Sequence, residues 1–273
     1  MASIAVNGAA GRMGKRVIGL AAEEQAHRIV AAIVRPGDPR LGEDAGVVAG
    51  GAAIGVPLTS GIPTSLDVEA AIDFSDADAS ARFVTTCVER KIPVVVATTG
   101  FHEKSRAHFE EAARLIPVFL APNLSIGVAL LAKLVADAAR ALGLEADVEI
   151  VESHHRKKKD SPSGTALQLA RAVAEARGQD LSEVATFGRH GISGGDRSRG
   201  EIAIHALRLG DVVGEHTVSF GFGAERIEIS HKAHSRDVFA RGALRAADFV
   251  ARACPGLYGP HDLLQDNGPS AST

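Results

Sequence analysis

The residue types most able to do chemistry gather in the segment Glu152 to Ala166. Two adjacent histidines, His154 and His155, end a predicted strand, and the four basic residues 156–159 follow them. A histidine titrates near neutral pH and can exchange a proton, while a lysine such as Lys158 can supply a proton or hold a carboxylate. A solvated surface loop is the simpler explanation of the lysines taken alone. A metal pair is the alternative for the histidines, but no cysteine or carboxylate with ligand spacing stands nearby, so no metal is expected.

The same segment leads into a helix whose start suits an anion. Ser161-Pro162-Ser163 is expected to cap a helix that runs from about Gly164 to Arg177. The first backbone N–H groups of such a helix, near Gly164 and Thr165, have no partner within the helix. Together with the neighbouring cations they favour negative charge. The pattern therefore predicts a site for an acidic small molecule.

A second candidate site lies near the N-terminus. Residues 4–14 have the pattern of a strand, a glycine turn and a helix start, with Gly8, Gly11 and Gly14 spaced three apart. Glycine lets the backbone turn tightly and approach a pyrophosphate, whose charge the N–H groups of the helix start can bind. Ala10 stands where the usual pattern has its second glycine, so a turn that only packs helix on strand is the alternative. The surrounding β-α-β pattern favours the dinucleotide site.

Two later strand ends support a ligand crevice in the same region. The predicted strand Val94–Ala97 ends in small hydroxyl residues, and the strand Val118–Leu120 ends in a proline and an asparagine. In a doubly wound sheet the carboxyl ends of the strands line the ligand crevice. The residues expected there are Ala97, Thr98 and Thr99 from the first strand end, and Ala121, Pro122, Asn123 and Leu124 from the second.

The elements that must position these residues form two patterns. Up to Asn123, short apolar strands alternate with helices, which is typical of a parallel sheet covered on both faces. After a long helix, Gly127–Leu142, come the strand Asp147–Ser153 and the capped helix. Three alternating strands then follow, with turns at Gly210-Asp211 and 221–225. The sequence predicts an α/β protein with a Rossmann-like doubly wound sheet and a second α+β domain.

Composition excludes several classes of protein. The chain has 273 residues and a formal net charge of -3, whereas a nucleic-acid binder normally has a basic excess. Its two cysteines, Cys87 and Cys254, are far apart, which fits a reducing cytosol better than a disulfide framework. The longest apolar stretch carries Lys133, Asp137 and Arg140, so no membrane-spanning segment is expected.

The motifs together resemble the dihydrodipicolinate reductase family, also called 4-hydroxy-tetrahydrodipicolinate reductases. The matches run in family order over nearly the whole chain, and they are more specific together than the glycine turn is alone. They are Gly8–Gly14, Ala97–Phe101, Glu152–Ala166, Gly210–His216, Ile229–Arg236 and Gly256–Tyr258.

The resemblance implies an activity, an architecture and a set of roles. Residues 1–125 and 235–273 would form a dinucleotide-binding domain, and 126–234 a substrate-binding domain with a mixed sheet that builds a homotetramer. The enzyme would transfer hydride from a nicotinamide to a small cyclic dicarboxylate in the cytoplasm, during diaminopimelate and lysine biosynthesis. His154 falls on the family's acid/base position, Lys158 on its proton donor, and His155, Gly164 and Thr165 on substrate-holding positions. The cofactor stretches fall on Gly8, Ala9, Ala10, Gly11, Arg12, Met13, Ala97, Thr98, Thr99, Ala121, Pro122, Asn123 and Leu124.

One departure from the family pattern bears on the cofactor. Many relatives carry an acidic residue where Val34 stands, and an acid there hydrogen-bonds the ribose 2′-OH of NADH. Arg35 follows, and a guanidinium pairs well with a 2′-phosphate. An exposed Arg35 without a role, or Asp38 reaching the ribose, are the alternatives. We expect NADPH to be preferred and NADH to remain possible.

Two other functions share the Rossmann half. One is a dehydrogenase of another small acid, such as an aspartate or semialdehyde-type oxidoreductase. The other is a regulator that senses nicotinamide without chemistry, although such a regulator would have no need of His154, Lys158 and the Gly164-Thr165 pair.

Overall fold

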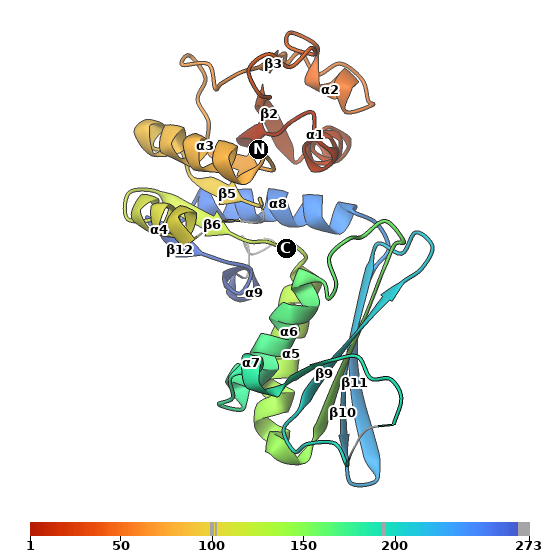
Figure 1. Ribbon diagram of the computed structural model, residues 1–273. Coiled ribbons are helices and arrows are strands. Elements are labelled where there is room, and N and C mark those ends of the chain that lie inside the picture. Colours follow the sequence, from red (N-terminus) through yellow and green to blue (C-terminus); the bar gives the residue numbers. More distant parts are fainter. Residues whose placement is uncertain (99–100, 102, 193–194, 267–273) are drawn as a thin grey trace, which may run out of the picture. The chain divides into compact units, whose positions relative to one another are not determined.

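The computed structural model describes residues 1–98, 101, 103–192 and 195–266 (Figure 1). The chain divides into two compact units, called here unit 1 (1–126 and 236–273) and unit 2 (127–235). Thr99, one of the residues predicted to line the cofactor crevice, lies outside the described residues. Within the described residues, no helix is both long and apolar enough to cross a membrane.

Unit 1 is built, in its described part, on a seven-stranded sheet in which every paired strand is parallel. From the central β1 the chain proceeds to β2 and β3 on one side, and to β4, β5 and β6 on the other. This reversal places a switch point between β1 and β4, as in a Rossmann-like fold, so the predicted fold class is confirmed. In spatial order the strands are β12 (Gly256–Tyr258), β6 (Pro117–Leu120), β5 (Val94–Val96), β4 (Ala70–Asp73), β1 (Ala2–Asn7), β2 (His27–Ile33) and β3 (Leu58–Thr59).

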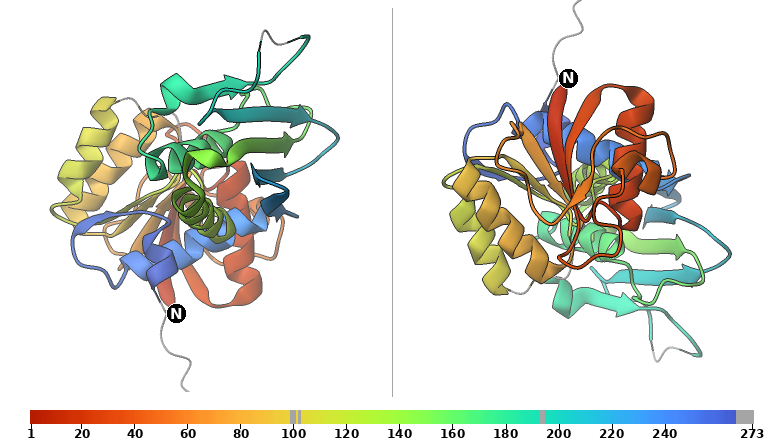
Figure 2. Two further views of the ribbon diagram at one scale, coloured as in Figure 1. Left: turned by 90° about the horizontal axis from the view of Figure 1, so that it is seen from below. Right: turned by 90° about the horizontal axis from the view of Figure 1, so that it is seen from above.

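Helices cover both faces of this sheet, which explains why its strands are apolar throughout. Ile4 and Val6 of β1 belong to the core beneath α1 (Arg12–Glu24) and α8 (Asp237–Val250), whereas Ala5 belongs to the core beneath α3 (Ala77–Arg90) and α4 (Glu103–Ala112). Figure 2 shows α3 and α4, in orange and yellow, on the opposite side of the sheet from α1 and α8, in red and blue. The short helices of unit 1 are α2 (Ala45–Val48) and α9 (Asp262–Gln265).

Unit 2 contains a mixed sheet with one helical layer. In its described part the strand order is β11-β10-β7-β9-β8, with β7–β9 and β8–β9 parallel and the other pairs antiparallel. Apolar side chains of α5 and α6 pack with those of the sheet in one core. The elements are α5 (Ile126–Leu142), the 3-10 helix η1 (Gly143–Glu145), β7 (Asp147–His154), α6 (Gly164–Ala176), α7 (Leu181–Val184), β8 (Ala185–Phe187), β9 (Ile202–Arg208), β10 (Gly214–Phe222) and β11 (Glu225–Ala233).

The predicted strand pairing in unit 2 is half right. β10 and β11 form the expected antiparallel hairpin. The turn at Gly210-Asp211 does not join neighbouring strands, because β7 lies between β9 and β10. A crossover through α6 makes β9 parallel to β7, and the ion pair between Arg208 of β9 and Glu152 of β7 joins strands that are far apart in sequence. Local alternation of apolar residues carries no information on such a pairing.

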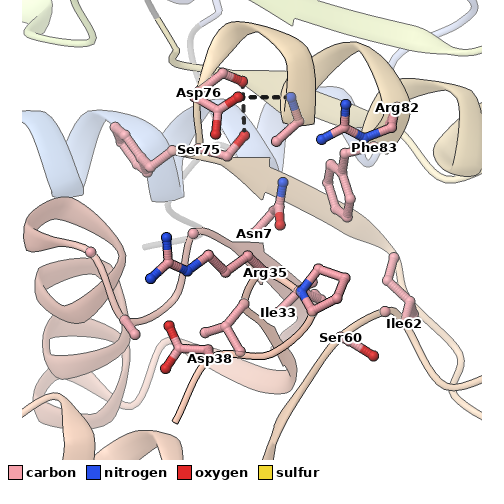
Figure 3. A pocket seen from close by; sticks show the side chains of 18 of the residues that line it. Asn7, Ile33, Arg35, Asp38, Ser60, Ile62, Ser75, Asp76, Arg82 and Phe83 are labelled. Atoms are coloured by element: carbon pink, nitrogen blue, oxygen red, sulfur yellow. Dashed lines mark hydrogen bonds between the residues drawn. The ribbon is translucent and has the colours of Figure 1, made fainter. Parts of the chain in front are cut away.

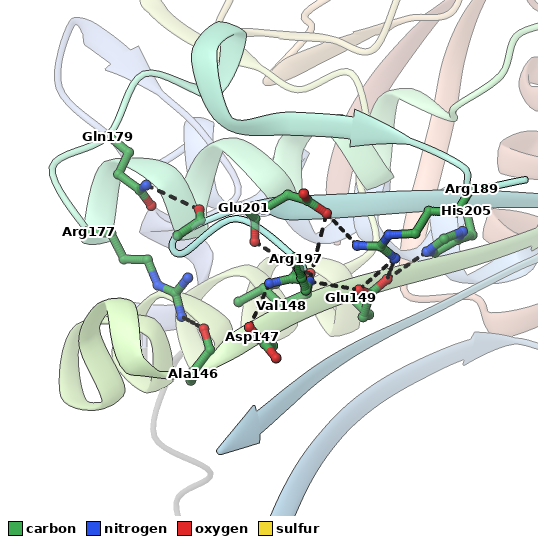
Figure 4. A network of polar contacts seen from close by, with 11 residues as sticks. Ala146, Asp147, Val148, Glu149, Arg177, Gln179, Arg189, Arg197, Glu201 and His205 are labelled. Atoms are coloured by element: carbon green, nitrogen blue, oxygen red, sulfur yellow. Dashed lines mark hydrogen bonds and ion pairs between the residues drawn. The ribbon is translucent and has the colours of Figure 1, made fainter. Parts of the chain in front are cut away.

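The other face of this sheet carries a polar network around Glu149 of β7 (Figure 4). Its carboxylate accepts hydrogen bonds from Arg189 at 2.9 Å and Arg197 at 3.3 Å, and lies 2.6 Å from His205 Nε2. Arg189 and Arg197 come from the glycine- and arginine-rich segment 188–200, so these contacts attach its described residues to the sheet. Glu201 also pairs with Arg189.

Gly242 in α8 tests how closely unit 1 is packed. An added Cβ there would lie 1.8 Å from the carbonyl oxygen of Leu124, whereas an added Cβ at Gly19 of α1 would have only ordinary contacts, the nearest at 3.5 Å. We predict that Gly242→Ala lowers the free energy of unfolding by about 2 kcal/mol through overpacking. Gly19→Ala should leave it unchanged or raise it by up to about 1 kcal/mol through helix propensity. Urea denaturation measures both, and equal effects would contradict the packing argument.

Candidate functional site

In the glycine turn after β1, the backbone at two glycines packs closely against carbonyl oxygens of the chain. Gly8 has a positive φ of 74°, and a Cβ there would lie 2.5 Å from the carbonyl oxygen of Phe74. A Cβ on Gly14 would lie 2.2 Å from the carbonyl oxygen of Gly8, so α1 can approach the turn only because position 14 is glycine. Gly11 precedes α1 and donates its N–H to the Gly8 carbonyl at 2.9 Å. The turn therefore places backbone without bulky side chains beside the N-terminus of α1. Such a site fits a pyrophosphate.

A cavity of about 610 Å³ opens beside this turn (Figure 3). Of the predicted cofactor residues, Gly8, Ala10, Gly11 and Arg35 line it. Arg35, two residues after the end of β2, and Arg82, from α3, lie on different sides of the cavity in Figure 3. Three arginines line this cavity, Arg35, Arg40 and Arg82. A nucleotide-sized space with glycine backbone and cations in its wall suits the phosphate-bearing half of a dinucleotide.

Asp38 lines the same cavity but is already paired. Arg40 donates to both of its carboxylate oxygens at 2.9 Å. These hydrogen bonds lower the pKa of Asp38 to about 2, so it stays ionised while its oxygens are occupied. The pair leaves Arg35 as the cation beside Val34 that the sequence singled out.

The carboxyl ends of three strands meet at a buried acid that the sequence analysis missed. Asp73 ends β4, is fully buried, and accepts a hydrogen bond from Asn7 Nδ2 of β1 at 2.7 Å. The hydroxyl groups of Ser75 and Thr98 also donate to it, at 2.6 Å and 3.0 Å. Thr98 follows β5, so Asp73 joins the strand ends on both sides of the switch point.

Several predicted cofactor residues lie elsewhere among the described residues. Ala9 is buried in the core beneath α1, and Leu124 packs in the same core. Asn123 accepts a hydrogen bond from the Ser125 backbone at 2.9 Å. Ala9 and Leu124 therefore contribute core packing, and Asn123 stabilises the backbone after β6. The predicted residues that do not line the cavity are Ala9, Arg12, Met13, Ala97, Thr98, Ala121, Pro122, Asn123 and Leu124.

In unit 2 the predicted acid/base histidine is bonded to a carboxylate. His154 ends β7, its side chain is 12% exposed, and its Nδ1 lies 2.5 Å from Oε2 of the fully buried Glu152. Arg208 donates to both oxygens of Glu152 at 2.9 Å, and the Ser163 N–H donates at 3.0 Å. Burial lowers the pKa of His154 despite this neighbour, so the ring is mainly neutral at pH 7.

The remaining predicted substrate residues surround the start of α6. Ser163 caps the helix as expected, accepting the Ala166 N–H at 3.1 Å. Gly164 is exposed, and an added Cβ there would meet no atom within 4 Å, so the helix start is accessible. Lys158 pairs with Asp160 at 2.9 Å. His155 is half-buried and lies next to His154 in the chain.

Three site residues of unit 2 were missed by the sequence analysis although a signal was present. Glu152, Arg208 and His216 each continue the buried face of their strands, at period-two spacing from apolar residues. A charged or polar residue at such a position needs a partner. His216 Nε2 lies 3.1 Å from Ser163 Oγ. The rings of His216 and His154 meet edge-on, with their centroids 5.2 Å apart. Burial and nearby His154 lower the pKa of His216 to about 4.

A Rossmann-like unit with a phosphate-binding turn, joined to a unit with a basic acid/base site, defines the class of dinucleotide-dependent oxidoreductases. Family models match both parts: "Dihydrodipicolinate reductase, N-terminus" over residues 2–124 and "Dihydrodipicolinate reductase, C-terminus" over 127–264. The chain belongs to the dihydrodipicolinate reductase family and is an oxidoreductase of diaminopimelate and lysine biosynthesis, as its sequence resemblance predicted. This family uses a nicotinamide cofactor.

Individual relatives agree. The chain is 47% identical to the 4-hydroxy-tetrahydrodipicolinate reductases of Geobacter sulfurreducens and Citrifermentans bemidjiense, over 97% of its length and 99% of theirs. Its fold is similar to that of a dipicolinate-bound dihydrodipicolinate reductase from Paenisporosarcina sp. TG-14, with a TM-score of 0.76, 23% identity, and coverage of 96% of this chain and 99% of that one.

The lowered pKa of His216 predicts a loss of stability in mild acid. In the unfolded chain this ring titrates near pH 6.5, and in the folded chain near 4. The unfolded state therefore binds the proton first as the pH falls through this window, and His216 costs about 2 kcal/mol of folding free energy by pH 5. The midpoint of thermal unfolding should drop less between pH 7 and pH 5 in His216→Gln than in the wild type. An equal drop would mean that His216 titrates normally in the fold.

Proposed function

We propose that this chain reduces 4-hydroxy-tetrahydrodipicolinate to tetrahydrodipicolinate, with unit 1 binding the nicotinamide cofactor and unit 2 the cyclic dicarboxylate. The observation that carries the assignment of roles is the Glu152–His154 pair beside the accessible start of α6. It supplies a titratable group next to N–H donors for a carboxylate. The dipicolinate bound by the relative from Paenisporosarcina is a dicarboxylate of the same kind.

The residues of unit 2 hold and protonate the substrate in this proposal. The N–H groups at Gly164 and Thr165 receive a substrate carboxylate at the positive end of the α6 dipole. His155 contributes to binding, while His154 and Lys158 exchange protons with the substrate or with water. Lys158 gives up its contact with Asp160 when it meets the substrate. When bound, the nicotinamide would supply a hydride to the ring carbon, while the hydroxyl group of the substrate would take up a proton and leave as water.

The residues of unit 1 bind the cofactor. The open backbone from Gly8 to Met13 receives the pyrophosphate, and the strand ends that follow β5 and β6 lie along the carboxyl edge of the sheet, where nicotinamide cofactors bind. Arg35 meets the 2′-phosphate, because Val34 offers the ribose no acceptor and Arg40 occupies Asp38. NADPH is therefore preferred to NADH.

We also propose that the enzyme works in the cytoplasm as a homotetramer assembled through the sheet of unit 2. The two cysteines, Cys87 and Cys254, form no disulfide, which fits a reducing compartment. On the open face of this sheet, Leu207 of β9 is an exposed apolar side chain that a second copy would cover.

Replacing His154 or Lys158 tests the catalytic roles. We predict that His154→Ala and Lys158→Ala each lower kcat by about 10²–10⁴-fold, the usual contribution of a positioned acid or base. Both variants should remain folded, but His154→Ala should lower the midpoint of thermal unfolding more than Lys158→Ala does, because it removes a partner of the buried Glu152. Steady-state kinetics with freshly made dihydrodipicolinate synthase product measures kcat, and calorimetry with NADPH checks that unit 1 is intact. Near-normal kcat in both variants would refute the assignment.

The cofactor preference is tested with both nucleotides. We predict a higher kcat/KM for NADPH than for NADH, and a loss of about tenfold or more in NADPH affinity in Arg35→Ala, because a charge-assisted pair with phosphate disappears. NADH affinity should change little. Arg28→Ala is the matched control, since Arg28 lies on β2, the strand that precedes Arg35, and does not line the cavity. A kcat/KM for NADH equal to or above that for NADPH would overturn the preference.

A further inference from the structure

Glu152 has the contacts of a residue that orients another. Its Oε1 accepts hydrogen bonds from the Ser163 N–H at 3.0 Å and from Arg208 Nη2 at 2.9 Å. Its Oε2 accepts from Arg208 Nη1 at 2.9 Å and faces His154 Nδ1 at 2.5 Å. Both oxygens are therefore fixed from two directions, and the carboxylate cannot turn away from His154 without losing a contact to Arg208.

The charge of this carboxylate determines which nitrogen of His154 carries the proton. Burial raises the pKa of Glu152, but hydrogen bonds from Arg208 and His154 outweigh this and hold its pKa below the usual range. An ionised carboxylate can only accept hydrogen bonds. The neutral imidazole must then carry its proton on Nδ1, so Nε2 is left with a free lone pair. Nε2 lies close to Gly214, where an added Cβ would be only 3.1 Å away.

We infer that Glu152 is a positioning residue, which fixes His154 in the Nδ1-protonated tautomer and makes Nε2 the atom that exchanges protons with the substrate. Arg208 and the N-terminus of α6 hold Glu152 in place for this role. The inference rests on the proposed acid/base role of His154, and it adds the group that sets the orientation and the active nitrogen of that histidine.

Glu152→Gln is the sharpest perturbation because it keeps the shape and removes the charge. An amide nitrogen at the Oε1 position would face two donors, Ser163 N–H and Arg208. At the Oε2 position it faces Arg208 and His154, and His154 can adapt by moving its own proton. We therefore expect the amide to donate to Nδ1 and the imidazole to become protonated on Nε2.

The tautomer is read directly by nitrogen-15 NMR of histidine-labelled protein, with His154→Gln used to assign the resonances. Wild-type His154 should show a protonated Nδ1 and an unprotonated Nε2, and Glu152→Gln the reverse. In Glu152→Gln kcat should fall by about 10²-fold or more, with a small change in substrate KM. The apparent pKa of His154 should also fall, because a carboxylate that favours the imidazolium is gone.

Glu149→Gln is the matched control. Glu149 lies on the same strand and is also bonded to a histidine and arginines, but on the opposite face of the sheet (Figure 4). In Glu149→Gln, kcat and the tautomer of His154 should remain those of the wild type. Size-exclusion chromatography checks that the variant assembles as the wild type does.

The outcomes separate the inference from the proposed function. A protonated Nε2 in wild-type His154 would overturn the inference even if Glu152→Gln failed to fold. So would a Glu152→Gln enzyme with an unchanged tautomer and kcat within about threefold of the wild type. Full turnover in His154→Ala would instead refute the proposed role of His154, whatever the tautomer measurement gave.

Discussion

The carboxylate of Glu152 is removed from water, and such a group is tolerated only when its charge and its oxygens are satisfied. In unit 2 the partners come from three elements: His154 from β7 itself, Arg208 from β9, and the backbone before α6. Satisfying this charge requires β9 beside β7 and the start of α6 next to the end of β7, with the His154 ring turned toward Glu152. The catalytic geometry proposed for this unit depends on that buried ion pair.

In unit 1 the corresponding constraint is the close approach of backbone at Gly8 and Gly14. Any side chain at either position would collide with a carbonyl oxygen, so the turn can take only this form next to β4 and α1. The charges that line the neighbouring cavity depend on ion pairs formed within the fold. Because Arg40 donates to both carboxylate oxygens of Asp38, that acid is already paired, and Arg35 remains for a phosphate.

Much of the fold and of the candidate site could be predicted from the sequence, because the patterns that indicate them are local. The alternation of strands and helices predicted the doubly wound sheet. Ser163 indicated the start of α6, and the glycine spacing predicted the turn. The order of β7, β9 and β10 could not be predicted, since it depends on a contact between residues 152 and 208 that no local pattern reveals. The two-residue strand β3 is too short to show a period. Asp73 was missed because its partners come from three strand ends that meet only in the fold.

A spectrophotometric assay shows whether this chain reduces the product of dihydrodipicolinate synthase with a nicotinamide cofactor. The synthase product is made freshly in the cuvette, NADPH and the purified protein are added, and the absorbance of the reduced nicotinamide is followed. We expect a fall in absorbance that requires the protein and the synthase product together. No fall with that product, or a faster fall with an oxo acid or a semialdehyde in its place, would contradict it.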